Sequence, residues 1–245
     1  MDVTDDRLLD GRLRLRQPRK GYRAGMDAAL LAAACDANVG ARVIEVGCGV
    51  GAVMLSAAVR RPGTSFTGIE KDPLALELAL ANIDANSLAD RVSALGGDIA
   101  HSFAKMGLSP FDAALANPPF FDDASALRGP SPAKTGAWVA DDGLPAWISF
   151  LCKSVRERGV ITLIHRADRL GDILAALSGK TGAIQIRPIM PFADEPAKRV
   201  IVRAVKGAKA PMRLLPPLVL HTRVGAKHDP ATERILRGEA ALEWL

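Results

Sequence analysis

The sequence predicts an α/β fold in which a mostly parallel sheet is wound with helices on both faces. Between residues 43 and 116, four short apolar runs are separated by helical and turn segments, which is typical of such sheets. The first run breaks into alternate glycines, and each later run ends beside an acidic or amide side chain. With 245 residues, 49% of them hydrophobic and 24% charged, the chain is long enough to bury one such sheet.

The glycine turn follows the first apolar run, residues 43–46, and contains Gly47, Gly49 and Gly51 before a helical pattern begins at Ala52. A turn at the end of a buried strand needs positive φ, and a ligand can approach closely where the backbone carries no Cβ atoms. The first amides of the next helix would face that ligand. Gly47, Gly49 and Ala52 also fit the looser dinucleotide fingerprint, so this stretch alone leaves a dehydrogenase and an ordinary glycine turn open.

Three polar positions follow the next three runs. Glu70 lies 21 residues after Gly49, about where a ribose-binding acid is expected, which favours a cofactor that contains adenosine. Asp98 follows the third run and Asn117 follows the fourth. Because ligands of wound parallel sheets bind beyond the carboxyl ends of the strands, we expect these side chains and the glycine turn to line one crevice.

The tetrapeptide Asn117-Pro118-Pro119-Phe120 completes this series of motifs. Together with Glu45 and the glycine turn, the series resembles the class I S-adenosylmethionine-dependent methyltransferases, in the branch that methylates planar nitrogens. Three further segments resemble the bacterial tRNA adenine-N6 methyltransferases that act next to the anticodon. These segments are residues 21–27, 164–170 and 196–200.

The resemblance implies a Rossmann-like fold with a seven-stranded sheet, in which a strand over residues 199–205 is inserted antiparallel, and S-adenosylmethionine as the cofactor. Glu45 is expected to face the methionine ammonium, or else to anchor the glycine turn. Glu70 can accept hydrogen bonds from both ribose hydroxyls, and Asp98, with the amide of Ile99, would recognise the adenine edge. The expected cofactor-binding residues are Glu45, Gly47, Gly49, Glu70, Lys71, Asp98, Ile99 and Asn117.

Asn117, Pro118 and Phe120 are the expected catalytic residues. An exocyclic adenine amine is flat and poorly nucleophilic, because its lone pair is delocalised into the ring. The Asn117 side-chain oxygen and the Pro118 carbonyl, held by prolines of fixed φ, can accept both N–H groups and favour a pyramidal nitrogen. Phe120 can stack on the target base. The alternative is that the tetrapeptide is only a rigid turn.

Other acceptors stay open at this stage. The side-chain amide of glutamine is also a planar nitrogen, but protein methyltransferases of that kind usually carry a helical domain before the glycine turn, and here only 42 residues precede Val43. DNA adenine methyltransferases usually carry a separate recognition domain. A small-molecule or O-methyl acceptor, and an RNA-binding protein with a relic cofactor pocket, are further alternatives.

The charge favours a polyanionic partner, with a net charge of +5 and an isoelectric point of about 9.3. Between Gly11 and Met26 there are six basic residues and no acidic ones, a run that could bind the phosphates of tRNA or form a solvated strand face. The basic residues near the end of the chain could add to such a surface. They are Lys198, Arg199, Arg203, Lys206 and Lys209.

We expect a single domain over residues 1–245, with a leader (1–40), a catalytic core (41–210) and a tail (211–245) whose strands the pattern does not place. The leader should form a hairpin around Asp10-Gly11, and Asp27 should cap a helix over residues 28–34. Residues 121–142 read as a mobile, substrate-facing loop. Other expected helices cover residues 73–86 (capped by Asp72), 144–155, 170–177 and 232–237, and other expected strands cover 160–164 and 183–190.

The three cysteines are widely spaced and the four histidines are scattered, so we expect no disulfide framework and no metal site. The amino terminus is acidic, and no apolar stretch reaches the 18 or more residues of a membrane span. A reducing cytoplasm fits this composition. The sequence leaves the oligomeric state open.

Overall fold

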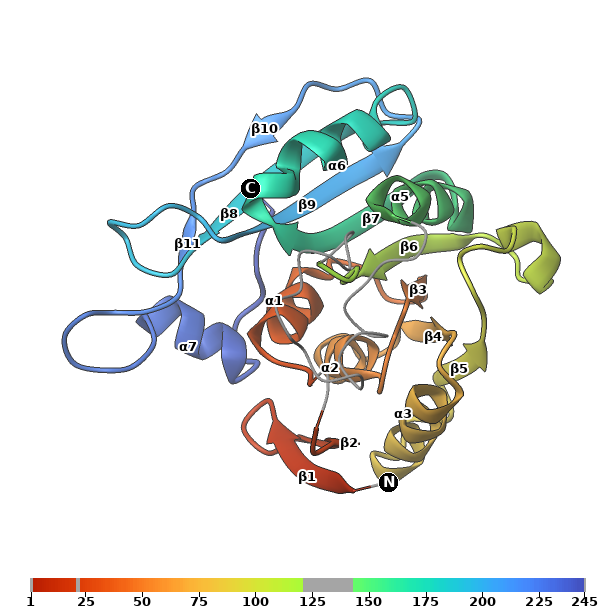
Figure 1. Ribbon diagram of the computed structural model, residues 1–245, viewed down its shortest axis with the longest axis horizontal. Helices are drawn as coiled ribbons and strands as arrows, with labels where there is room; N and C mark the ends of the chain where they lie inside the picture. The colour runs from red at the N-terminus through yellow and green to blue at the C-terminus, as the bar shows by residue number, and fades with distance from the viewer. Residues whose placement is uncertain (1, 21–22, 121–142, 245) are drawn as a thin grey trace.

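The computed structural model describes residues 2–20, 23–120 and 143–244, in which a large twisted sheet separates two layers of helices (Figure 1). Within the described residues this sheet has nine strands. They are β3 (Arg42–Val46), β4 (Ser65–Glu70), β5 (Val92–Gly96), β6 (Phe111–Ala116), β7 (Val155–Arg166), β8 (Thr181–Met190), β9 (Arg199–Lys206), β10 (Arg213–Leu214) and β11 (Leu218–Val219).

The order of the strands is β10-β8-β9-β7-β6-β3-β4-β5, and β11 also pairs with β8. Strands β5, β4, β3, β6 and β7 are parallel to one another, whereas β9 lies antiparallel between β7 and β8. The predicted wound sheet and its inserted antiparallel strand are therefore confirmed. The strand order reverses at β3, between β4 and β6, and ligands of open α/β sheets bind at such a point.

The sheet has two strands more than the expected seven. Both come from the tail, where β10 and β11 pair in parallel with β8 over two residues each. Strand β8 would otherwise leave a row of backbone N–H and C=O groups unpaired at the edge of the sheet. Such short segments carry no periodicity, which is why the sequence pattern did not place them.

The α-helices form two layers: α1, α2 and α3 pack on one face of the sheet, and α5 and α6 pack on the other (Figure 1). Neighbouring residues of β3 belong to different cores, since Val43 packs with the first layer and Ile44 and Val46 with the second. The described α-helices are α1 (Met26–Ala34), α2 (Ala52–Arg60), α3 (Pro73–Ala85), α5 (Gly143–Ser154), α6 (Leu170–Leu177) and α7 (Pro230–Leu236). Short 3-10 turns cover η1 (Phe103–Met106) and η3 (Ala167–Arg169).

The leader forms the expected hairpin, with β1 (Val3–Leu8) antiparallel to β2 (Leu13–Pro18). Its turn is longer than a two-residue one, because Leu8 pairs with Leu13 across four turn residues. The expectation that Asp27 caps α1 is wrong. The residue before the helix is Gly25, without a side-chain cap, and Asp27 instead pairs with Arg199 of β9. Asp72, by contrast, caps α3 as predicted, because its side chain accepts the Leu74 amide.

Four arginines of the basic leader lie beside carboxylates of its amino-terminal part. Arg14 lies 2.8 Å and Arg16 lies 4.0 Å from Asp5. Arg19 pairs with Asp2 at 2.9 Å, and Arg23 pairs with Asp6 at 2.7 Å. The acids precede the basic run in sequence, and the antiparallel pairing of β1 with β2 brings them against it. The side chains of these pairs are between about one third and 71% exposed, so water screens the attraction and each pair adds little to stability.

The tail packs against α1. The Leu242 amide and the Trp244 indole donate to the carbonyls of Ala33 and Ala34, at 3.0 and 2.9 Å. These carbonyls belong to the last turn of α1, where no helical amide is available to them. Arg60 of α2 also donates to the Ala240 carbonyl at 2.9 Å. Among the described residues, no helix is both long enough and apolar enough to cross a membrane.

Asn82 of α3 and Asn86, the residue that follows this helix, bind the backbone of β2. Asn82 and Asn86 each accept a backbone N–H and donate to a backbone C=O, at Arg16 and Arg14 respectively, with distances of 2.7–2.9 Å. Four residues of helix rise about 6.0 Å and two residues of strand about 6.6 Å, so the two spacings match. Asn82 also donates to the Val50 carbonyl of the glycine turn at 3.0 Å.

We expect Asn82→Ala to lower the free energy of unfolding by about 2 to 3 kcal/mol, because it leaves buried backbone groups without partners. Urea denaturation monitored by circular dichroism measures this loss. Asp84→Ala is the matched control, since Asp84 lies exposed on the same helix and should change stability by less than about 0.5 kcal/mol. Equal losses in the two variants would contradict the role of Asn82.

Candidate functional site

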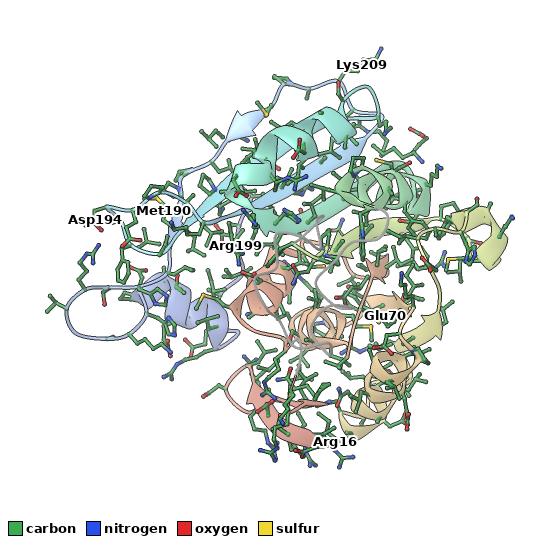
Figure 2. All side chains as sticks on the ribbon, in the orientation of Figure 1. Arg16, Glu70, Met190, Asp194, Arg199 and Lys209 are labelled. Atoms are coloured by element: carbon green, nitrogen blue, oxygen red, sulfur yellow. The ribbon has the colours of Figure 1, made fainter. Side chains whose placement is uncertain are left out.

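The predicted polar residues converge at the carboxyl edge of the sheet. Glu45 lies in β3, Glu70 ends β4, Asp98 follows β5 and Asn117 follows β6. These four strands are adjacent and parallel, so their ends meet at one edge. Figure 2 labels Glu70 near β4 and Arg199 near α1. The expected crevice therefore contains groups from four strands.

The glycine turn adopts the predicted strand-turn-helix geometry. The amides of Gly47 and Cys48 both donate to the Ile69 carbonyl of β4, at 2.9 and 3.0 Å. Gly47 and Gly49 have φ of 69° and 54°, in the left-handed region. A Cβ atom at Gly47 would lie 2.5 Å from the Trp147 ring of α5, whereas a Cβ at Gly49 would meet nothing within 4 Å. The backbone at Gly49 is thus open to a ligand.

Glu70 braces this turn. Its Oε2 accepts the Gly49 amide at 2.7 Å, and its Oε1 accepts the amides of Lys71 and Asp72, both at 2.9 Å. A carboxylate has about four acceptor positions, so three are used within the protein. The ribose hydroxyls would have to use the remaining position or share the others. The cofactor contact of Glu70 stays a prediction.

Lys71 and Asp98 lie together where β4 and β5 end. The Lys71 Nζ is 3.9 Å from the Asp98 Oδ2, and the Asp98 Oδ1 accepts the Ala100 amide at 2.9 Å. Ile99, which lies between Asp98 and Ala100 in the sequence, is partly buried and packs against the core beneath α5 and α6. The structure brings these predicted cofactor-binding residues together, and one Asp98 carboxylate oxygen accepts a backbone amide of the local turn.

Glu45 is buried, with 2% of its surface exposed. Its Oε2 accepts the Met54 amide of α2 at 2.8 Å. Burial raises the pKa of the Glu45 carboxyl well above its ordinary value, and the nearby Glu70 charge raises it further, while the Met54 hydrogen bond lowers it. The observed contact is the anchoring one, between β3 and the helix after the glycine turn.

Asn117, Pro118 and Phe120 follow β6 directly, and all three are at least partly buried. The Phe120 ring meets the His165 ring edge to face, with centroids 5.2 Å apart and planes at 87°. The Arg199 guanidinium lies over the Phe120 ring, 4.5 Å from its centroid. The predicted catalytic tetrapeptide therefore contacts β7 and β9 as well as the cofactor-side strands.

Sequence reasoning missed three neighbours of the site: Trp147 against Gly47, and His165 and Arg199 against Phe120. His165 and Arg199 lie in segments that carried the resemblance, but His165 had no assigned role and Arg199 was expected only as part of a basic surface. A register between β7 and β9 was the missing information, because it places Arg166 opposite Arg199 and His165 opposite Val200. The loop expected over residues 121–142 lies outside the described residues. Among the residues described, no group of three or more His, Cys, Asp or Glu could hold a metal ion.

The crevice has the features that an adenosine-containing ligand needs. It offers an open glycine backbone at Gly49, carboxylates at Glu70 and Asp98, and the ammonium of Lys71. On its acceptor side, Asn117 and Phe120 supply an amide and an aromatic ring. The binding roles of these residues stay predictions.

Comparisons with known proteins agree with this geometry. A family model described as the methyltransferase small domain matches residues 23–128. A curated tRNA1(Val) (adenine(37)-N6)-methyltransferase of Porphyromonas gingivalis is 30% identical over 189 residues, which cover 73% of this chain and 72% of the relative. One of the same name from Yersinia pestis is 29% identical over 181 residues, which cover 74% and 71%.

Among solved structures, a predicted O-methyltransferase from Agrobacterium tumefaciens is similar, with a TM-score of 0.73 and 25% identity over 88% of this chain and 97% of that one. A tRNA (m1A58) methyltransferase from Aquifex aeolicus has a TM-score of 0.55 at 15% identity, over 79% of this chain and 73% of that one. The second likeness concerns the fold alone.

The buried carboxyl of Glu45 predicts a pH-dependent difference between the wild type and Glu45→Gln. Because its folded pKa is raised above the ordinary 4.5, the folded state keeps a proton that the unfolded state releases, and stability falls as the pH rises from 4.5 toward the raised value. The glutamine variant lacks this loss. We therefore expect the free energy of unfolding of the variant to rise relative to that of the wild type as the pH goes from about 5 to about 8, the range in which folded proteins are usually most stable. Urea unfolding of the apoprotein measures the difference, and one that does not change with pH would contradict this assignment.

Proposed function

This chain belongs to the class I S-adenosylmethionine-dependent methyltransferases, and from that premise we propose that it methylates the exocyclic N6 of an adenine in tRNA, near the anticodon. S-adenosylmethionine is its methyl donor. The observation that carries the proposal is the position of Asn117-Pro118-Pro119-Phe120 at the end of β6, beside the crevice of Glu70 and Gly49. The names of the relatives, at about 30% identity, support the tRNA substrate.

The sulfonium of the donor supplies an already activated methyl group, so the protein must chiefly align the acceptor and make it nucleophilic. The Asn117 side-chain oxygen and the Pro118 carbonyl accept the two N–H groups of the adenine amine. This favours the pyramidal nitrogen of the transition state over the flat ground state. The methylated nitrogen is a strong acid, and it loses its proton to water without a side-chain base.

Phe120 stacks on the target base and sets its plane, a contact of about 1–3 kcal/mol in other nucleic-acid complexes. A base in an anticodon loop can be turned out at a cost of a few kcal/mol or less. The arginines of β2 contact RNA phosphates. Both Arg14 and Arg16 of β2 lie beside Asp5, which is exposed, so exchanging this carboxylate for phosphates costs little. The cytoplasm, where tRNA is found, is the proposed location.

Incubation of the purified protein with labelled S-adenosylmethionine tests this function. Bulk bacterial tRNA, release-factor proteins and DNA are offered separately, and the digested products are analysed by mass spectrometry. We expect N6-methyladenosine in tRNA. Label on a protein glutamine would keep the planar-nitrogen chemistry but overturn the substrate, and label on DNA or on none of the three would overturn the proposal.

Asn117→Ala should lower kcat by about a hundredfold or more, because an acceptor used in the transition state is lost. The affinity for S-adenosylmethionine, measured by calorimetry, should stay within a few-fold. Glu70→Ala should do the reverse and weaken cofactor binding first. Asn117→Asp keeps an oxygen acceptor and should retain more activity than the alanine variant. A loss of cofactor affinity in Asn117→Ala as steep as its loss of activity would contradict the catalytic role.

A further inference from the structure

Side chains from β7 and β9 contact the Phe120 ring, and neither of these strands contains an expected cofactor-binding residue. His165 of β7 is fully buried and meets the ring edge to face, and its Nε2 lies 3.4 Å from the Pro119 carbonyl. Arg199 of β9 covers the ring at 4.5 Å. Because β9 runs antiparallel to β7, its first residue lies at the edge where β7 ends. Both side chains therefore reach the tetrapeptide after β6.

The Arg199 guanidinium is itself fixed. Its Nε donates to the Asp27 Oδ2 of α1 at 3.0 Å, and its Nη1 donates to the Lys198 carbonyl at 3.1 Å. The side chains of Arg199 and Asp27 are 30% and 24% exposed, so this pair is partly shielded from water. A planar guanidinium with two directed hydrogen bonds has a defined plane, and that plane lies against the aromatic ring.

We propose that Arg199 is a positioning residue for the acceptor: anchored by Asp27, its guanidinium holds the Phe120 ring in the plane on which the target base stacks. This inference rests on the proposed function, because a stacking platform matters for a flat acceptor. Through these contacts Arg199 of β9 links Asp27 of α1 to Phe120, which follows β6. Figure 2 labels Arg199 near α1. Arg199 acts through Phe120 and is not itself a catalytic residue.

A phosphate-binding role for Arg199 makes a different prediction. A cation that contacts phosphate contributes to the salt dependence of RNA binding, at about 0.7 log–log units for a single-stranded contact. Lysine can replace arginine as a point charge. Lysine cannot replace the planar group that bonds Asp27 through Nε and stacks on Phe120. The two roles are therefore separated by Arg199→Lys.

The experiment uses the full chain, S-adenosylmethionine and bulk bacterial tRNA. We expect Arg199→Ala to lower kcat by about tenfold to a hundredfold, since a misplaced reacting group costs up to about that much. The KM for S-adenosylmethionine and the salt slope of tRNA binding should not change. Arg199→Lys should recover less than half of the lost activity on a logarithmic scale.

Asp27→Asn tests the anchor. It should lower kcat in the same direction as Arg199→Ala, and the double variant should lose no more than Arg199→Ala alone, because both changes remove one interaction. Additive losses would overturn the coupling of Asp27 to Arg199, and the proposal with it.

Arg203 provides the matched control on the same strand. The sequence placed it among the basic residues of a possible RNA surface, but its side chain is only 17% exposed, so the structure removes it from that surface. It pairs with Asp36, just past the end of α1, at 2.8 Å, and its guanidinium lies 5.9 Å from the Trp244 ring, away from Phe120. Arg203→Ala should lower stability without changing kcat at a temperature where the variant is folded. Circular dichroism of each variant confirms that it is folded.

Each outcome decides between the roles. Full recovery by Arg199→Lys, or a smaller salt slope in Arg199→Ala, would assign Arg199 to a phosphate and overturn the positioning role. An equal loss of kcat in Arg203→Ala would make the effect one of strand stability and also overturn it. Equal activity of the wild type and Arg199→Ala would overturn this inference alone. A wild type that leaves tRNA unmethylated would overturn the proposed function and the inference with it.

Discussion

The carboxylate of Glu70 is the contact on which the geometry of the crevice depends. It joins the end of β4 to the middle of the glycine turn through the Gly49 amide at 2.7 Å. The turn is also bonded to the Ile69 carbonyl, so two consecutive residues of β4 hold it. Glycine residues can adopt many backbone conformations, and these hydrogen bonds stabilise one of them in the turn.

This arrangement buries the carboxyl group of Glu45, and burial disfavours its charged form. Glu45 lies beneath the turn, and its buried carboxyl has a pKa raised by desolvation first and by Glu70 second. Its hydrogen bond with Met54 couples β3 to the first turn of α2, where backbone amides are available. A cationic group in the crevice would offset the repulsion between the two carboxylates. The anchoring contact and the expected ammonium contact are therefore compatible, and the first one is observed.

The surroundings of Phe120 come from elements other than the strands around the glycine turn. Its aromatic ring follows β6, but the ring's neighbours come from β7, β9 and, through Asp27, from α1. The longest of these connections joins Asp27 to Arg199, which are 172 positions apart in the sequence. Glu45, Glu70, Asp98 and Asn117 are brought to one edge by the ends of the adjacent strands β3, β4, β5 and β6, whereas the contacts of Phe120 require the antiparallel insertion of β9 between β7 and β8.

The sequence by itself determined the wound sheet, the glycine turn, the Asp72 cap and the common edge of Glu70, Asp98 and Asn117, because each depends on local periodicity, turn chemistry or the parallel order of successive strands. Tertiary structure alone decided the partners of Asp27, Arg199 and His165, the pairing of the leader arginines with earlier acids, and the two added strands of the tail. Those contacts depend on strand register and on edge pairing between distant segments. A side chain's local pattern carries no information about which distant group will lie opposite it.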